Sequence, residues 1–249
     1  MKSTRGRRTI VAAATLLGLA ISILGANIAD AKELDIALCA PDRNRFTLDI
    51  GNEFLPLQLG RQWSFVGEDE GITVGLQIDV LDETKTLFNG RAKVTTRVVQ
   101  ETEWEDADGD GVVGVGESLI EVSLNYFAQT QDGTVCYFGE DVDIYEDGQV
   151  VSHEGAWRAD EPGNAPGIFM PASPMEGMSF AQEVAPGIAE DEATIVGSGT
   201  VEVPAGTFAD TIRVREFNPL DGGKGYKAYA RGVGLILDDT LALVRYSVP

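Results

Sequence analysis

Hydrophobic side chains recur at every second position through most of the chain after residue 60. The segment Ile72-Thr73-Val74-Gly75-Leu76-Gln77-Ile78-Asp79-Val80 shows this period clearly. Alternation of period two is typical of β-strands with one buried and one solvated face. The pattern also covers residues 62–66, 92–99, 120–127, 135–138, 142–145, 149–157, 179–184, 193–203, 211–216, 225–230, 233–237 and 241–248. We expect these thirteen segments to form about eleven or twelve strands.

Turn-forming residues separate several of these segments. Asn89-Gly90, Asp132-Gly133 and Asp147-Gly148 tolerate the positive φ angles that tight hairpin turns require. Residues 158–177 instead carry four prolines, which have no amide hydrogen for a β-ladder, and this predicts a long irregular crossing. A single helical turn is expected near Phe208–Asp210, after Pro204-Ala205-Gly206.

Composition agrees with a globular β protein. The 249 residues are 43% hydrophobic and 24% charged, and the 29 glycines and 10 prolines argue against a helical bundle. Neither a linker nor a shift in composition divides the chain after residue 31. We predict a single all-β domain over residues 32–249, built as one strongly curved antiparallel sheet that forms an open barrel or a sandwich.

The first 31 residues have the order of a secretory signal peptide. Four basic residues precede an apolar run at 10–25, and the small-residue sequence Ala29-Asp30-Ala31 follows it. The run falls short of the roughly 20 residues that span a bilayer comfortably. We expect cleavage after Ala31 and export to the periplasm or the medium. Arg7-Arg8 also resembles a twin-arginine export signal, the alternative being two adjacent arginines by chance.

The charge is strongly negative, with 40 acidic against 19 basic residues and a formal net charge of −21. Removal of the first 31 residues, which hold four basic and one acidic side chain, would take it to −24. Such a protein repels phosphate backbones and anionic membrane surfaces. Nucleic acid is therefore not an expected partner, and no segment after residue 31 has transmembrane length.

Cys39 and Cys136 are the only two cysteines of the chain. In an oxidising compartment such a pair usually forms a disulfide, and the chain-entropy model values a loop of this length at roughly 4–5 kcal/mol. The alternative is a pair of free or buried thiols. With one histidine, His153, beside them, a zinc site built from Cys and His ligands is not expected.

Residues 106–117 carry the most specific chemical motif. They read Asp-Ala-Asp-Gly-Asp-Gly-Val-Val-Gly-Val-Gly-Glu, with acidic side chains at loop positions one, three, five and twelve, Gly at six and Val at eight. This resembles the calcium loop of the EF-hand family over all twelve positions. A hard dication needs six to eight oxygen ligands, and alternate residues of a curled segment can supply them. The proposed ligands of one Ca²⁺ are Asp106, Asp108, Asp110, the Val112 carbonyl and Glu117.

The segments that flank this loop differ from those of an EF-hand, which has a helix on each side. Here Val94–Trp104 and Leu119–Phe127 alternate and are rich in β-branched and aromatic residues, so we expect two strands with the loop at a hairpin tip. A structural calcium site is expected rather than a switch that uncovers a groove. The alternative is an acidic, glycine-rich turn that binds no ion.

A second acidic group lies at Tyr137–Asp143 and at His153-Glu154 across a predicted hairpin. A general acid/base pair or another cation site could be built from these residues. A charged hairpin edge that resists aggregation explains them more simply. Because Ser179 and Ser198 lack a nucleophile-elbow context and the chain has one histidine, we do not expect an enzyme.

Several segments resemble those of an uncharacterised group of exported bacterial β proteins and, in general form, the half-barrel carriers of lipids and lipoproteins. They are 137–143, 166–168, 203–208 and 229–235, and the resemblance extends from about Asn52 to Leu243. That group has a short turn where this chain has residues 106–117. The resemblance implies a second candidate function, transport of an apolar, lipid-like ligand. Its pocket would be lined by Trp63, Phe65, Leu76, Ile78 and Val98.

Overall fold

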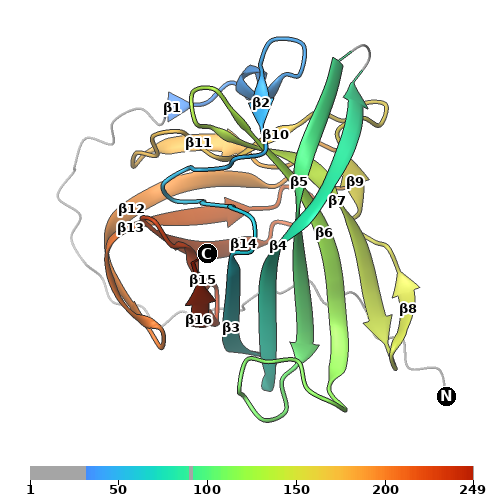
Figure 1. The fold of residues 1–249 in the computed structure, drawn as a ribbon, viewed down its shortest axis with the longest axis vertical. Helices are drawn as coiled ribbons and strands as arrows, with labels where there is room; N and C mark the ends of the chain where they lie inside the picture. Colours follow the sequence, from blue (N-terminus) through green and yellow to red (C-terminus); the bar gives the residue numbers. More distant parts are fainter. Residues whose placement is uncertain (1–31, 90–91, 249) are drawn as a thin grey trace.

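A computed structural model describes residues 32–89 and 92–248, and the predicted signal peptide lies outside them. The described chain is all-β, as predicted, and its strands belong to one large curved sheet that hydrogen bonds do not close (Figure 1). None of the described helices is long and apolar enough to cross a membrane. The elements are β1 (Lys32–Glu33), η1 (Ile36–Cys39), β2 (Phe46–Thr47), β3 (Gln62–Asp69), β4 (Ile72–Asn89), β5 (Ala92–Glu105), β6 (Ser118–Thr130), β7 (Val135–Glu146), β8 (Gln149–Ser152), β9 (Trp157–Arg158), β10 (Gly167–Met170), β11 (Met178–Ala181), β12 (Glu192–Val203), β13 (Gly206–Phe217), β14 (Lys224–Ala230), β15 (Gly234–Asp238) and β16 (Leu241–Ser247).

The strand order is β1-β11-β12-β13-β14-β15-β16-β3-β4-β5-β6-β7-β10, with β2 on β6 and both β8 and β9 on β7. The expectation of a purely antiparallel sheet is wrong at one end, because β1 pairs with β11 in parallel. β16 lies in the middle of this order, between β15 and β3. In Figure 1 the sheet curls so that β12 and β13 face the side formed by β4, β5 and β6.

Residues 32–89 and 92–248 form sixteen strands, more than the predicted eleven or twelve, since several are only two to four residues long. Strands this short leave no periodic signal in a sequence. One of them, β10, lies inside the crossing that the prolines predicted to be irregular. Pro166 and Pro171 bracket this strand and leave its four residues free to pair with β7.

The predicted helical turn near Phe208–Asp210 is wrong. These residues belong to β13, and Phe208 pairs with Val201 in β12. The reason is the tightness of the preceding hairpin, in which Val203 already pairs with Gly206. Only Pro204 and Ala205 lie outside the ladder, so β13 starts before a helical turn can form.

Two predicted hairpin turns are confirmed. Asp147 and Gly148 have φ angles of 51° and 73°, as a two-residue hairpin turn between β7 and β8 requires. Gly133, with φ of 100°, lies in the turn between β6 and β7. The third turn, at Asn89-Gly90, extends beyond the described residues.

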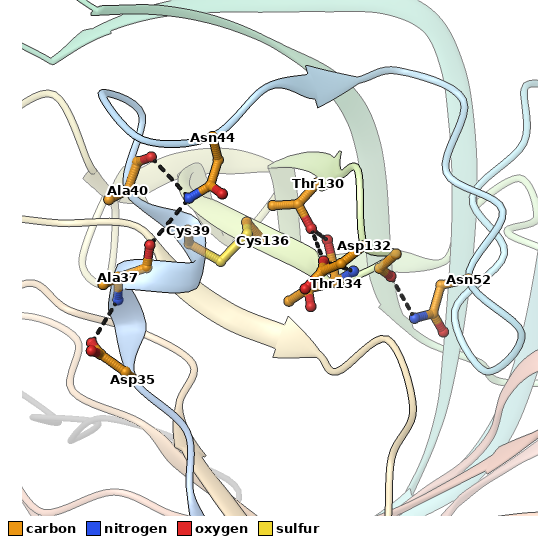
Figure 2. The surroundings of a disulfide bond; sticks show 11 residues. Asp35, Ala37, Cys39, Ala40, Asn44, Asn52, Thr130, Asp132, Thr134 and Cys136 are labelled. Atoms are coloured by element: carbon orange, nitrogen blue, oxygen red, sulfur yellow. Dashed lines mark hydrogen bonds between the residues drawn. A yellow bond between two sulfur atoms is a disulfide. The ribbon is translucent and has the colours of Figure 1, made fainter.

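The disulfide between Cys39 and Cys136 is confirmed, with Cα atoms 5.7 Å apart and both residues fully buried. It joins η1 to β7 (Figure 2). Asp35 caps η1 by accepting a hydrogen bond of 2.8 Å from the Ala37 amide, and the Asn44 side chain donates to the Ala37 and Ala40 carbonyls. The disulfide therefore joins this segment to the sheet covalently, and the side-chain hydrogen bonds order the segment itself.

Candidate metal centre

The calcium-loop motif occupies the connection between β5 and β6. β5 ends at Glu105, β6 begins at Ser118, and these two residues pair across the antiparallel ladder. Residues 106–117 therefore form the tip of a β-hairpin, which confirms the predicted placement between two strands.

Asp106, the first residue of the motif, accepts hydrogen bonds from the backbone of the loop that follows it. Its side chain is fully buried, and its backbone N–H donates to the Thr73 carbonyl at 2.9 Å. The two carboxylate oxygens accept hydrogen bonds of 3.0 Å from the amides of Gly109 and Gly111. The positive φ angles of these glycines, 71° and 70°, bend the backbone around the carboxylate. The loop therefore curls around its first acidic residue.

Glu117 closes the loop from the other end. Its Oε1 accepts from the Ala107 amide at 3.0 Å, and its Oε2 accepts from the Gly114 amide at 2.6 Å. Carboxylate oxygens of Asp106, Asp108 and Glu117 lie within 4.8 Å of one another. At about 4 Å, two like charges repel by roughly 4 kcal/mol at an effective dielectric constant of 20. A dication placed among the three carboxylates would convert this repulsion into attraction.

The remaining predicted ligands are not part of this group of three. Asp110 accepts a hydrogen bond of 2.8 Å from the Val112 amide through its Oδ1. Asp108 in turn accepts from the Asp110 amide at 3.3 Å. Coordination by Asp110 and by the Val112 carbonyl stays a prediction. The structure brings together the first, third and twelfth positions of the motif.

The loop also packs against the sheet. Gly111 is buried, and a Cβ atom at this position would lie 2.9 Å from Val244 Cγ2 and 3.1 Å from Val66 Cγ2. The Gly111 carbonyl accepts a hydrogen bond of 3.4 Å from Arg245, whose guanidinium also donates to the Ser64 hydroxyl. The loop is thus fixed on the two neighbouring strands β3 and β16. No sequence signal linked Arg245 to the motif.

A second group of acidic side chains lies on the inner face of the sheet, the face that carries Phe65 and Leu76. Directly paired residues share a face. From Leu76 the pairing continues to Glu103 in β5 and then to Glu121 in β6. In the other direction Phe65 pairs with Leu243 in β16. Leu241 lies two residues before Leu243 in β16 and is therefore on the same face. It pairs with Asp238 in β15, and Asp238 pairs with Lys227 in β14, so both charged residues also lie on the inner face.

The curvature of the sheet brings the acidic residues of β5 and β6 close to those of β13 and β15, and Lys227 of β14 interacts with both groups. Lys227 Nζ lies 3.3 Å from a Glu216 oxygen and 3.4 Å from an Asp238 oxygen. Burial by itself would lower the pKa of Lys227, but Asp238 and Glu216 outweigh it and raise this pKa well above its usual value. Burial, opposed in part by Lys227, raises the pKa of Glu101 to about 7. Burial and the neighbouring Glu121 raise the pKa of Glu103 to about 8.

Sequence analysis missed this acidic inner face. The signal was present in Gln100-Glu101-Thr102-Glu103, which continues the alternation of Val98-Val99 with glutamates at the inward positions. The expected strand over Val94–Trp104 already placed both glutamates on one face, but the sequence did not show that this face points into the curved sheet.

The residues expected to line an apolar pocket are all buried in the hydrophobic core. Trp63, Phe65, Leu76 and Ile78 share the inner face through their pairing. Val98 precedes Val99, which shares the inner face with Glu101, so Val98 lies on the opposite face. The inner face therefore combines an apolar region with carboxylates and one lysine, and does not form a continuous apolar lining.

The acidic hairpin around β7 carries Asp141 and Asp143 on one face of the strand and Glu140 on the other. Asp141 forms ion pairs with Lys85 at 3.3 Å and with Arg158 at 2.8 Å, and accepts a hydrogen bond from the Tyr126 hydroxyl. Asp143 contacts His153 Nδ1 at 2.9 Å. Both carboxylates have structural partners, which favours the simpler interpretation of a charged hairpin.

Comparisons of this chain with protein-family models, with curated proteins and with solved structures find no match.

Proposed function

We propose that this chain is an exported calcium-binding β protein in which residues 106–117 bind one Ca²⁺ in a structural role. The observation that carries the proposal is the convergence of Asp106, Asp108 and Glu117, whose carboxylate oxygens lie within 4.8 Å of one another in a loop with EF-hand spacing. Oxygen ligands of this type, on a short curled segment, suit Ca²⁺. The disulfide agrees with an oxidising compartment outside the cytoplasm.

The structural role follows from the surroundings of the loop. Its ends are the paired strands β5 and β6, and its middle is bound to β3 and β16 through Gly111. Calcium would remove the mutual repulsion of the carboxylates and hold the loop in this position. Strands on both sides leave no helix pair that could swing apart on binding.

Calcium titration calorimetry of the purified protein in about 0.15 M salt tests the proposal, since salt at this concentration suppresses diffuse counter-ion binding to so acidic a chain. We expect one site with a Kd of about 10⁻⁴–10⁻³ M or tighter. Asp106→Asn and Glu117→Gln should each abolish the heat of binding. The control is Glu146→Gln, which replaces an exposed carboxylate in the β7–β8 hairpin. This variant should bind calcium as the parent protein does. Equal heats for all four proteins would rule out a site in this loop.

A further inference from the structure

A hollow of about 680 Å³ lies at the β1 end of the sheet, away from the calcium loop. It opens where the chain after β1 diverges from the chain after β11. Leu34 and Ile36 contribute apolar surface from one side, and Val184 from the other. Its volume is in the range of ligand-binding clefts.

Every charged residue that lines this hollow is acidic. Two of the five carboxylates have structural partners, because Asp35 caps η1 and Glu190 accepts a hydrogen bond of 2.7 Å from the Gly187 amide. Glu33, Glu183 and Glu192 remain as lining carboxylates. The hollow thus combines apolar walls with a negative potential.

Glu183 lies at the inner end, next to the acidic inner face. Burial, and after it the charges of Asp191 and Glu216, raise the pKa of Glu183 to about 8, while Lys227 opposes them. Beside it, Asp191 Oδ1 is buried and has no hydrogen-bond partner among the described residues. The Glu183 carboxyl therefore keeps its proton at neutral pH in the free protein, and a basic group that reached this point would favour the ionised carboxylate.

The adjacent strand also has backbone groups that face away from the sheet. The amides of Lys32 and Leu34 donate to the carbonyls of Gly177 and Ser179, at 3.0 and 2.8 Å. In a parallel pair, alternate residues turn their amide and carbonyl to opposite sides, so those of Glu33 point away from β11. Among the described residues, β1 is the last strand at this end of the sheet. Such an edge can pair with an additional extended segment.

We propose that this hollow binds an extended peptide segment that carries one lysine or arginine between apolar side chains. Its basic side chain would pair with Glu183, and its apolar neighbours would contact Leu34, Ile36 and Val184. Its backbone would pair with Glu33 at the free edge of β1. Glu33 and Glu192 would attract the basic peptide from solution. This site shares no residue with the calcium loop and does not depend on the proposed function.

Fluorescence anisotropy with a short labelled peptide of sequence Ser-Val-Leu-Arg-Leu-Val-Ser tests the proposal, with a second peptide that has Gln in place of Arg. We expect saturable binding of the first peptide and binding at least about tenfold weaker for the second, because a buried pair that loses one charge costs more than 1.4 kcal/mol. Glu183→Gln, which keeps the side-chain shape, should weaken the arginine peptide by a similar factor.

Glu33→Gln combined with Glu192→Gln should slow association and reduce its salt dependence, with a change of about threefold in affinity. Glu146→Gln is the control for the loss of one negative charge and should change nothing. Circular dichroism in the near ultraviolet confirms the fold of each variant. Equal binding of the arginine and glutamine peptides, or an equal loss in Glu146→Gln and Glu183→Gln, would overturn the proposal. So would an alkylamine that bound as tightly as the arginine peptide, since the occupant would then be a small cation.

Discussion

Arg245 donates a hydrogen bond to the carbonyl of Gly111, so β16, the last described strand along the chain, holds a loop that lies 134 residues earlier. The same guanidinium donates to Ser64 in β3. Together with Val66 and Val244, which enclose Gly111, this contact makes the loop part of the packed sheet. Calcium bound by residues 106–117 should therefore affect the stability of the whole domain.

Gly111→Ala should destabilise the protein and weaken calcium binding together. The substitution adds a Cβ to a residue with φ of 70° and forces it against two valine side chains, so we expect a loss of about 3 kcal/mol in unfolding free energy. Gly109→Ala is a matched control, because its φ is 71° but a Cβ there would have no atom within 4 Å. It should cost about 1 kcal/mol. Urea unfolding measures both, and equal losses would contradict the packing argument.

Saturating calcium should raise the melting temperature. A ligand that binds only the folded state at 100 times its Kd contributes about 2.7 kcal/mol, which corresponds to roughly 5–10 °C for a domain of this size. Differential scanning calorimetry with excess calcium and with chelator measures the shift. Asp106→Asn should melt at the same temperature in both conditions. A shift of equal size in this variant would place the bound ion elsewhere.

Trp104 should report calcium binding through its fluorescence. It lies two residues before Asp106, is fully buried, and packs so closely on β4 that a Cβ at Gly75 would lie 2.3 Å from its ring. Ordering of the loop should change the surroundings of this indole and hence its emission. Trp104→Phe should remove most of the calcium-dependent change. Trp157→Phe, at a side chain packed against Tyr137, should retain it.

Stability should fall as the pH rises from about 4.5 to 8 in the presence of chelator. Burial raises the pKa of Glu101 to about 7 and, together with Glu121, that of Glu103 to about 8, whereas the usual value is 4.5. Within this window the folded protein keeps protons that the unfolded chain has released, so the stabilisation is complete below pH 4.5 and lost by pH 8.

Glu103→Gln tests this dependence, because it removes one of the two titrations. At pH 9 it should be more stable than the parent protein by about 2 kcal/mol, and at pH 5 nearly equal to it. Urea unfolding at both pH values gives the comparison. Glu202→Gln, at an exposed position of β12, should follow the parent at each pH. A parent protein whose stability increased over this window would contradict the assignment.

Loss of the disulfide should lower the unfolding free energy by about 4–5 kcal/mol. The bond closes a loop between residues 97 apart, and the chain-entropy model gives this magnitude. Cys39→Ala with Cys136→Ala, compared with the oxidised parent by urea unfolding, measures it. The reduced parent should match the double variant, and an unchanged midpoint in both would show that other contacts fix η1 to β7.

Much of the fold was predictable because a strand of eight or more residues repeats its period several times. β12 and the first half of β4, for instance, were predicted from alternation, and the hairpins at Gly133 and Gly148 were predicted from their turn residues. The short strands β1, β2, β9 and β10 were not, since their positions depend on partners far along the chain. The predicted turn at Phe208 failed because the pairing of β12 continued through it.

The calcium loop was predictable for a similar reason, since its ligand spacing is local. The meeting of Asp106, Asp108 and Glu117 needs only twelve consecutive residues. The support from Arg245 and Val244, and the encounter of Glu101 with Lys227, depend on which strands become neighbours. Neither alternation nor spacing contains that information, so the acidic inner face emerged only from the pairing of β16 with β3 and the curvature of the sheet.

The central position of β16 has a consequence for biosynthesis. During translation, β3–β7 can pair among themselves, and so can β11–β15, but each set keeps one exposed edge until residues 241–247 emerge from the ribosome. Exposed edges of this kind recruit chaperones or aggregate. The sheet is therefore completed only when β16 is available, and a chain that lacked β16 would leave two unjoined halves.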